Sequence, residues 1–113
     1  MQRQFRLTRS TEFKRVRRDG QSYAHPLIVL IVSENQLSIT QVGVAAGKRV
    51  GNAVIRNRAK RLMRAAAREL HPKIKFGYDI IIVARKPIIQ TKMPQVRDAL
   101  HILLQRAQLI QDV

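Results

Sequence analysis

The sequence predicts an α+β protein, a small two-layer sandwich of helices on a sheet, with its elements in the order α-β-β-α-β-α. Two observations carry this prediction. Three segments repeat apolar residues at helical spacing, and the segments between them are rich in β-branched residues. The length of 113 residues suits one domain, residues 1–113. Such elements can bury one shared core, and the pattern leaves the order of the strands in the sheet open.

The first helix is expected to begin at Ser10, which suits an N-cap, and to end at Gly20. Phe13 and Val16 form its apolar face, and its other side is basic. This helix is short, so it needs packing against the rest of the protein to persist.

An apolar, β-branched run over residues 22–33 predicts the first strand. Pro26 interrupts this run and favours an edge position or the start of a strand, because proline has no amide donor. After a turn at residues 34–36, residues 37–47 predict the second strand. We expect a bulge near Gln41, where the alternation of apolar residues changes parity.

The strongest helical pattern begins after Asn52, a good N-cap, and ends at about His71, before Pro72. Its apolar positions are Ile55, Ala59, Leu62, Met63, Ala66 and Leu70. Residues 78–86 then predict a strand covered on both faces, since its apolar run is continuous. A last helix is expected over residues 94–108. Its inward positions are Val96, Leu100, Leu103, Leu104 and Ala107.

The chain is strongly basic. It has 22 Lys and Arg residues against 7 Asp and Glu, a formal net charge of +15, and no acid between Glu34 and Glu69. A disordered basic tail is poor in apolar residues, whereas 45% of this chain is hydrophobic. The charge therefore belongs to a folded body, and its field predicts a polyanionic partner.

Several classes of protein are disfavoured. The chain has no cysteine, which excludes a disulfide framework and thiolate metal sites. The longest apolar run, residues 27–32, is far shorter than the roughly twenty residues of a membrane helix. The polar, basic residues 1–10 do not resemble a secretory signal. We therefore expect a cytoplasmic protein.

We expect no catalytic residue and no metal site in the chain itself. The histidines His25, His71 and His101 are scattered, and the 7 acids form no ligand cluster. His71 is interpreted as a helix cap and His101 as a residue of a helix surface. If the protein takes part in catalysis, another molecule supplies the active site.

The helix that follows Asn52 has one cationic side. At about 100° per residue, its apolar residues share one sector and a row of cations stands opposite. This cationic row consists of Arg56, Lys60, Arg64 and Arg68, with Asn57 and Arg61 beside it and Arg58 nearest to the apolar boundary. Each like-charged pair at i, i+4 costs about 0.2–0.5 kcal/mol. A solvated surface face is the alternative interpretation, but no acid interleaves the row, which favours an anionic partner.

The loop before this helix is also basic. Residues 47–52, "GKRVGN", place Lys48 and Arg49 just before a helix N-terminus, where free amides and the helix dipole attract anions. The glycine spacing differs from that of a nucleotide-binding P-loop, and Arg49 follows the lysine where that motif has Ser or Thr. We expect phosphate contact in this loop and no nucleotide hydrolysis.

Other anionic partners suit the charge less specifically. A basic helix can enter a DNA major groove, which charge alone does not exclude. A membrane surface is disfavoured because the apolar side of this helix is needed for the core. Phe13, Tyr23, Phe76 and Tyr78 could stack on single-stranded bases, but we expect them in the core.

Residues 43–70, "GVAAGKRVGNAVIRNRAKRLMRAAAREL", resemble the signature of the bacterial ribonuclease P protein component. The hallmark of that family is an Arg-Asn-Arg motif in a long basic helix, here Arg56, Asn57 and Arg58, after a Lys-(Lys/Arg)-x-Gly-Asn-Ala-Val-like segment. The segments "RLTRSTEFKRVRRDG" and "YDIIIVARKP" match as well. The resemblance therefore covers nearly the whole chain.

This resemblance implies an α+β sandwich with a left-handed β-α-β crossover, an exception to the usual right-handed rule. It implies that the protein is the accessory subunit of an endoribonuclease whose catalytic RNA supplies the active site. That RNA performs Mg²⁺-dependent hydrolysis to remove the 5′ leader of precursor tRNA, and the protein binds both the catalytic RNA and the leader. We expect neither a membrane nor DNA as a partner.

Carried over by position, contacts to the catalytic RNA would come from the basic helix and the loop before it. These residues are Lys48, Arg49, Arg56, Asn57, Arg58, Lys60, Arg61, Arg64 and Arg68. The leader would bind in a cleft between the first helix and the sheet, near Phe13 and Arg17. Many family members have an aromatic residue at the position of Arg17, so phosphate or cation–π contact is expected there in place of base stacking.

Two alternatives stay open on the residues alone. A non-catalytic RNA-binding protein of the ribosome would share the charge and the small fold but would not stimulate cleavage of precursor tRNA. A DNA-binding regulator would discriminate DNA sequences and usually dimerise. The sequence has no heptad pattern to support such a dimer.

Overall fold

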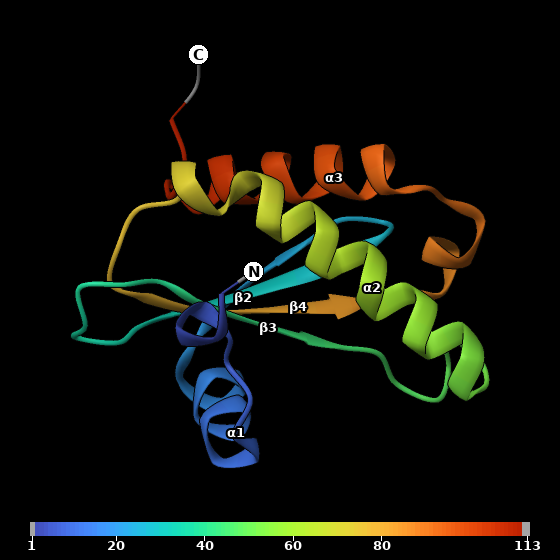
Figure 1. The fold of residues 1–113 in the computed structure, drawn as a ribbon, viewed down its shortest axis with the longest axis horizontal. Coiled ribbons are helices and arrows are strands. Elements are labelled where there is room, and N and C mark those ends of the chain that lie inside the picture. The colour runs from blue at the N-terminus through green and yellow to red at the C-terminus, as the bar shows by residue number, and fades with distance from the viewer. Residues whose placement is uncertain (1, 112–113) are drawn as a thin grey trace.

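The computed structural model describes residues 2–111 of the chain. A four-stranded sheet carries α2 and α3 on one face and α1 on the other (Figure 1). The helices and strands are α1 (Ser10–Asp19), β1 (Gln21–Ala24), β2 (Ile28–Glu34), β3 (Gln41–Ala45), α2 (Ala53–Leu70), β4 (Tyr78–Ala84) and α3 (Met93–Arg106). Three short 3₁₀ helices join them: η1 (Arg3–Phe5), η2 (His71–Lys73) and η3 (Lys86–Gln90).

The α+β class is confirmed, but the expected order α-β-β-α-β-α is one strand short. The run over residues 22–33 forms two strands, β1 and β2, because the chain reverses around Pro26. The amide of His25 donates to the carbonyl of Ile28 at 2.9 Å, and the amide of Leu27 donates to His25 Nδ1 at 3.1 Å. Pro26 thus lies in the turn just before β2, where its missing amide donor costs no ladder hydrogen bond.

The strand expected over residues 37–47 is shorter, and it has no bulge at Gln41. Gln41 instead begins β3. The segment before it is a loop shaped by Asn35, whose Oδ1 accepts from the amide of Leu37 at 2.8 Å, and by Gln36, which has a φ of 65°. Such an Asx turn replaces ladder pairing with a local hydrogen bond. The change of parity in the sequence marks the end of this loop.

The strands lie in the order β1-β2-β4-β3. β2 pairs antiparallel with both β1 and β4, whereas β3 and β4 are parallel neighbours joined through α2. This connection is the expected β-α-β crossover, and its left-handed turn stays a prediction of the resemblance. β4 is central and covered on both faces, as its continuous apolar run predicted.

The helix α2 begins and ends where the sequence indicated. The side chain of Asn52 accepts from the amide of Ile55 at 3.0 Å, and His71 is the C-cap residue. The expected cap of α1 is wrong in its position, because Ser10 is the first helical residue and Arg9 precedes it without a side-chain cap. Gly20 ends α1 as expected.

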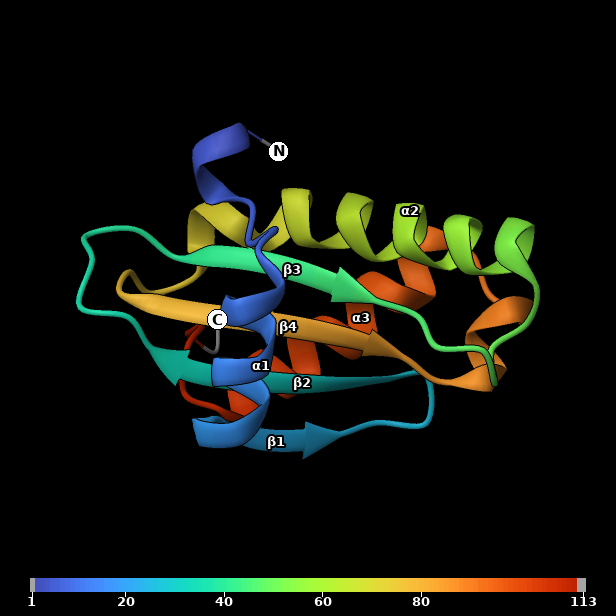
Figure 2. The same ribbon diagram turned by 90° about the horizontal axis from the view of Figure 1, so that it is seen from below.

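The two faces of the sheet bury cores of different size. The main core lies under α2 and α3 and includes Met63, Leu103 and Ile82. A smaller cluster under α1 consists of Leu7, Val16, Ile31 and Ile81, with Phe13, Val29 and Val83 packed against it. Figure 2 shows the single helix α1 lying across the strands on that face. None of the helices in residues 2–111 is long and apolar enough to cross a membrane.

Candidate nucleic-acid interface

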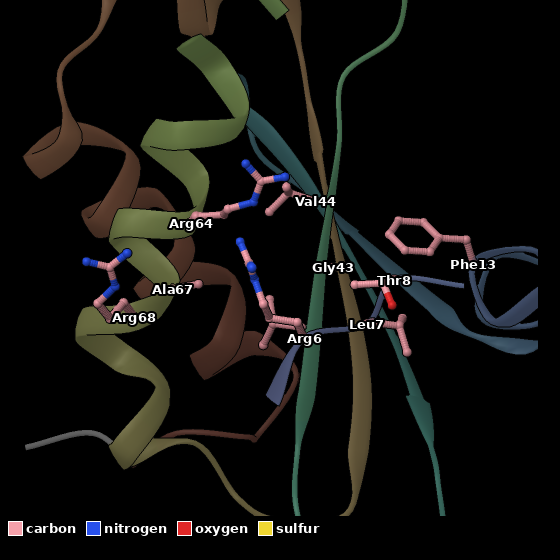
Figure 3. A pocket seen from close by; sticks show the side chains of 10 residues that line it. Arg6, Leu7, Thr8, Phe13, Gly43, Val44, Arg64, Ala67 and Arg68 are labelled. Carbon is pink, nitrogen blue, oxygen red and sulfur yellow. The ribbon is translucent and has the colours of Figure 1, made fainter. Parts of the chain in front are cut away.

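A cleft of about 300 Å³ lies where α2, β3 and the segment before α1 meet (Figure 3). Its lining residues are Arg6, Leu7, Thr8, Phe13, Val42, Gly43, Val44, Arg64, Ala67 and Arg68. Three of them are arginines and none is acidic. Figure 3 shows the side chains of Arg6 and Arg64 in the space between α2 and β3, while Phe13 reaches β3 from α1. The cleft thus combines a cationic side with an aromatic one.

Arg6 is a residue of this cleft that the sequence interpretation missed. A parallel bridge joins Arg6 to Val42 at the free edge of β3, and the amide of Leu7 donates to the carbonyl of Val42 at 2.9 Å. Leu7 is buried in the cluster under α1, and Arg6 is exposed. Arg6 stands between the apolar residues Phe5 and Leu7, and this alternation is typical of an extended segment. The alternation was the signal in the sequence that could have placed Arg6 beside a strand.

Phe13 lies directly against the backbone of β3. A Cβ atom built on Gly43 would come within 2.4 Å of Phe13 Cζ and 3.0 Å of the carbonyl oxygen of Leu7. Only glycine therefore lets the ring approach this strand so closely. The contact fixes Phe13 on the α1 side of β3, across the strand from Arg6 and Arg64 (Figure 3).

A buried ion pair holds α1 on the sheet. Arg15 on α1 donates to one carboxylate oxygen of Asp79 on β4, and Asn35 Nδ2 donates to the other at 2.9 Å. The side chain of Asp79 is 3% exposed and that of Arg15 is 35% exposed. Asn35 Nδ2 also donates to the carbonyl of Ile39 at 3.1 Å, so the pair extends into the loop between β2 and β3. This network places Phe13, two residues before Arg15, relative to the cleft.

The cationic row stands on the side of α2 that faces away from the main core, but its members differ in exposure. Arg68 is exposed, while Arg56, Lys60 and Arg64 are half-buried. The Nε atom of Arg56 is buried without a hydrogen-bond partner within the described residues. Arg64 and Arg68 belong both to the row and to the cleft wall, so one cationic surface continues from the helix into the cleft.

The other predicted RNA-binding residues lie around this row. Lys48 and Arg49 are exposed in the loop before α2, and Asn57 and Arg61 are exposed on the helix. Arg17 is exposed on α1 but is not among the residues that line the cleft. The structure therefore brings Phe13, Arg64 and Arg68 together in the cleft and leaves Arg17 outside it.

Arg58 has contacts within the protein. Its Nη2 donates to the carbonyl of Thr91 at 2.9 Å and its Nη1 to the carbonyl of Ile89 at 3.5 Å. These carbonyls lie at the end of η3, which connects β4 to α3. Arg58 thus ties α2 to this connection, consistent with its place near the apolar boundary of the helix.

The clearest pKa shifts lie outside the cleft. The hydrogen bond from Arg18 lowers the pKa of Asp19 at the exposed end of α1. The pKa of Arg97 on α3 is raised, first by its hydrogen bond with Asp98. No group of three or more His, Cys, Asp or Glu side chains within residues 2–111 is arranged to hold a metal ion. Because three arginines and no acid line the cleft, its guanidinium groups can bind an anion.

The fold and this surface define a class, that of small, basic α+β proteins that bind RNA. Comparison with known proteins makes the assignment specific. The family model described as Ribonuclease P matches residues 1–108. The ribonuclease P protein component of Roseiflexus castenholzii is 38% identical over 112 residues, which are 98% of this chain and 92% of that relative. That of Natranaerobius thermophilus is 52% identical over 79 residues, 70% of this chain and 69% of the relative.

Solved structures agree. The RNase P protein of Staphylococcus aureus superposes with a TM-score of 0.83 at 28% identity, covering 95% of this chain and 98% of that one. The RNase P protein of Thermotoga maritima superposes with a TM-score of 0.80 at 27% identity, covering 89% of this chain and 96% of that one. The chain belongs to the ribonuclease P protein family, the accessory subunits of a ribonucleoprotein endoribonuclease that matures the 5′ ends of tRNAs.

Proposed function

We propose that this chain binds the catalytic RNA of ribonuclease P through the cationic side of α2 and holds the 5′ leader of precursor tRNA in the adjacent cleft. The observation that carries this proposal is the continuity of the two surfaces. Arg64 and Arg68 belong to both, and no acid lines the cleft. The complex would act in the cytoplasm, where precursor tRNA is its substrate.

The cationic row suits a folded RNA. A row of like charges on one helix is unfavourable in the free protein, and phosphates along an RNA backbone remove that penalty. Lys48 and Arg49 would extend the contact past the N-terminus of α2, whose free amides also favour phosphate. Arg58 contributes mainly by holding α2 against η3, since its guanidinium already donates to Ile89 and Thr91.

The cleft suits a single strand. A single-stranded nucleic acid offers phosphates to cations and base faces to aromatic rings. Here Arg6 and Arg64 supply the cations, Phe13 supplies a ring, and Val42, Gly43 and Val44 form the floor. Arg17, outside the lining, would meet a phosphate only after the strand has passed Phe13.

The Mg²⁺ ions that this reaction uses would be held by the RNA and its substrate. Mg²⁺ prefers carboxylate and phosphate oxygens, and the residues of the cleft present guanidinium groups instead. This donor set does not fit a protein-bound Mg²⁺ ion. The protein would reduce the Mg²⁺ requirement by neutralising phosphates that otherwise repel one another when the leader approaches the catalytic RNA.

Salt dependence tests the first half of this proposal. With roughly five phosphates engaged, a plot of log affinity for the catalytic RNA against log salt concentration should have a slope of about −3.5 to −4.5. A flat plot would contradict the proposal.

Leader dependence tests the second half. The assembled holoenzyme would be measured for binding to precursor tRNA with a leader and to mature tRNA without one. Arg6→Gln should weaken binding of the leader-bearing substrate only. Arg106→Gln is a matched control, because it removes the same charge on α3, where Arg106 donates to the carbonyl of Ala24 on the edge strand β1, away from the cleft. Equal effects of the two variants would contradict the assignment of the cleft.

A further inference from the structure

Phe76 is the most exposed aromatic residue within residues 2–111, whereas Phe5, the other aromatic residue outside the two core clusters, is half-buried beside His71. Phe76 lies in the segment between η2 and β4, and it is 73% exposed. Tyr23 and Tyr78 are half-buried and pack on the main core, and Phe13 packs on the cluster under α1. The expectation that Phe76 is a core residue is therefore wrong, and its exposed ring has a face free for stacking on a base.

The backbone on both sides of the ring is held in place. Among the described residues, the backbone groups of Lys75 and Gly77 make the hydrogen bonds Lys75 N to Leu109 O (2.9 Å), Thr40 Oγ1 to Lys75 O (2.5 Å), Gly77 N to Ile39 O (3.2 Å) and Asn35 N to Gly77 O (2.9 Å). Gly77 has a φ of +95°, a conformation that favours glycine. Figure 1 shows this segment descending from α2 to β4 beside the connection from β2 to β3. The ring is thus presented from a fixed backbone, which lowers the entropy cost of binding.

The polar groups beside the ring suit the edge of a base. Lys73 and Lys75 both precede Phe76 in the sequence, and both are exposed. The ring also borders a hollow of about 220 Å³ whose other lining residues are Glu34, Gln36, Gly77 and Tyr78. The carboxylate of Glu34 and the amide of Gln36 can hydrogen-bond to the edge of a base, while Lys73 and Lys75 line a separate hollow of the same segment. The ring and the base-edge partners thus occur together at one end of the sheet.

We propose that Phe76 is a stacking platform for an unpaired base of the catalytic RNA. The segment that carries Phe76 follows α2 through η2, so it lies beyond the point where the cationic row ends at Arg68. This inference rests on the proposed function, because it extends the same RNA contact past the helix. A protein partner suits the site less well. The neighbouring exposed apolar residue is Leu37, and Glu34 and Gln36 line the hollow beside the ring, which leaves little apolar area for a protein interface.

The test compares four variants in binding to the catalytic RNA: Phe76→Ala, Phe76→Leu, Phe76→Trp and, as a control, Ile102→Ala. Ile102 is also an exposed apolar residue, 39% exposed on α3. Since base stacking on an aromatic residue contributes about 1–3 kcal/mol, Phe76→Ala should weaken binding by roughly 5- to 150-fold. Phe76→Leu should lose a similar factor because leucine keeps the apolar volume but not the ring. Phe76→Trp should restore the affinity, and its fluorescence should be quenched when RNA binds.

Two outcomes would overturn this inference. If Phe76→Ala binds the catalytic RNA like the wild type and Ile102→Ala, no base stacks on the ring. If Phe76→Leu binds like the wild type, the contact is apolar and not aromatic. Thermal melts of each free variant would identify any loss of folding. Phe76→Trp gives an independent test, because a folded Trp variant should keep its affinity for the RNA and its fluorescence should be quenched on binding.

The same binding measurements distinguish a failure of the stacking site from a failure of the proposed function. If the wild type itself fails to bind the catalytic RNA, the proposed function fails and this inference fails with it. If the wild type binds with a steep salt dependence and Phe76→Ala and Phe76→Leu bind as tightly as it does, the proposed function stands and the stacking site alone is refuted.

Discussion

The two faces of the sheet are built differently. One face is covered by two long helices over a large apolar core, and the other by the short helix α1 over the small cluster of Leu7, Val16, Ile31 and Ile81. On the first face, apolar packing dominates the contacts that position the helices, and hydrogen bonds such as those of Arg58 add to it. On the second, α1 depends also on the buried pair of Arg15 and Asp79.

The first face mainly provides stability, whereas the second face also positions residues that contact the substrate. The main core supports α2 and leaves its cationic side free for RNA. On the other face, the single helix α1 and the segment before it bring Phe13 and Arg6 to the edge strand β3, where the cleft lies. Loss of packing under α2 and α3 should therefore affect folding most, whereas changes under α1 should affect the leader as well.

The largest expected effect comes from two neighbouring residues of β4 that point to opposite faces. Ile80 belongs to the main core and Ile81 to the cluster under α1. Ile80→Ala should lower the free energy of unfolding by about 3–5 kcal/mol, and Ile81→Ala by about 2–3 kcal/mol, because the single helix α1 can settle into the cavity. Urea unfolding measures both. A larger loss of unfolding free energy for Ile81→Ala than for Ile80→Ala would contradict the view that the main core contributes more to stability.

Removing either partner of the ion pair under α1 should lower stability, but by different amounts. Arg15→Ala leaves a carboxylate buried without its cation and should cost about 3 kcal/mol. Asp79→Ala leaves Arg15 without its partner, but Arg15 is one-third exposed and can reach water. This substitution should therefore lower the free energy of unfolding by only about 1 kcal/mol. Urea unfolding of the two variants gives the order, and the double variant shows the coupling. Equal losses would mean that the carboxylate is hydrated when Arg15 is removed.

A smaller effect is expected at the contact between α1 and β3. Gly43→Ala forces its new methyl group against the ring of Phe13 and should destabilise the protein by about 1–3 kcal/mol. The holoenzyme should also lose affinity for leader-bearing precursor tRNA. Adding Phe13→Leu should recover part of the stability but not the leader affinity. If the double variant recovers neither, the carbonyl of Leu7 and not the ring sets the limit.

The smallest effects separate two arginines of α2. Arg58→Gln should cost about 1 kcal/mol of stability, because it loses the hydrogen bonds to Ile89 and Thr91. Arg61→Gln should leave stability unchanged and reduce the magnitude of the salt slope for RNA binding by about 0.7–0.9. Thermal melts and salt titrations of both variants test this division. A reduced slope with unchanged stability in Arg58→Gln would assign Arg58 to the RNA.

The sequence predicts those parts of the fold that follow from local patterns. The helix α2 and the strand β4 have long periodic or continuous apolar runs, and both were placed within a few residues. The hairpin of β1 and β2 was missed, because the reversal at Pro26 depends on hydrogen bonds to His25. Local pattern does not contain those contacts.

The site was predictable to a similar degree. The cationic row follows from helical spacing, and the position of Arg58 near the apolar boundary was a signal of its structural contacts. Arg6 enters the cleft only through its long-range bridge to Val42. The exposure of Phe76 depends on four hydrogen bonds from distant segments, so composition alone placed it in the core.

The most direct test of the central claim is cleavage of a leader-bearing precursor tRNA at limiting Mg²⁺. The reactions would contain a bacterial ribonuclease P RNA alone, this protein alone, and both together. The account predicts no cleavage by the protein alone and a large stimulation of the RNA when the protein is added. Tight binding to the RNA without stimulation would contradict it and would favour a general RNA-binding protein.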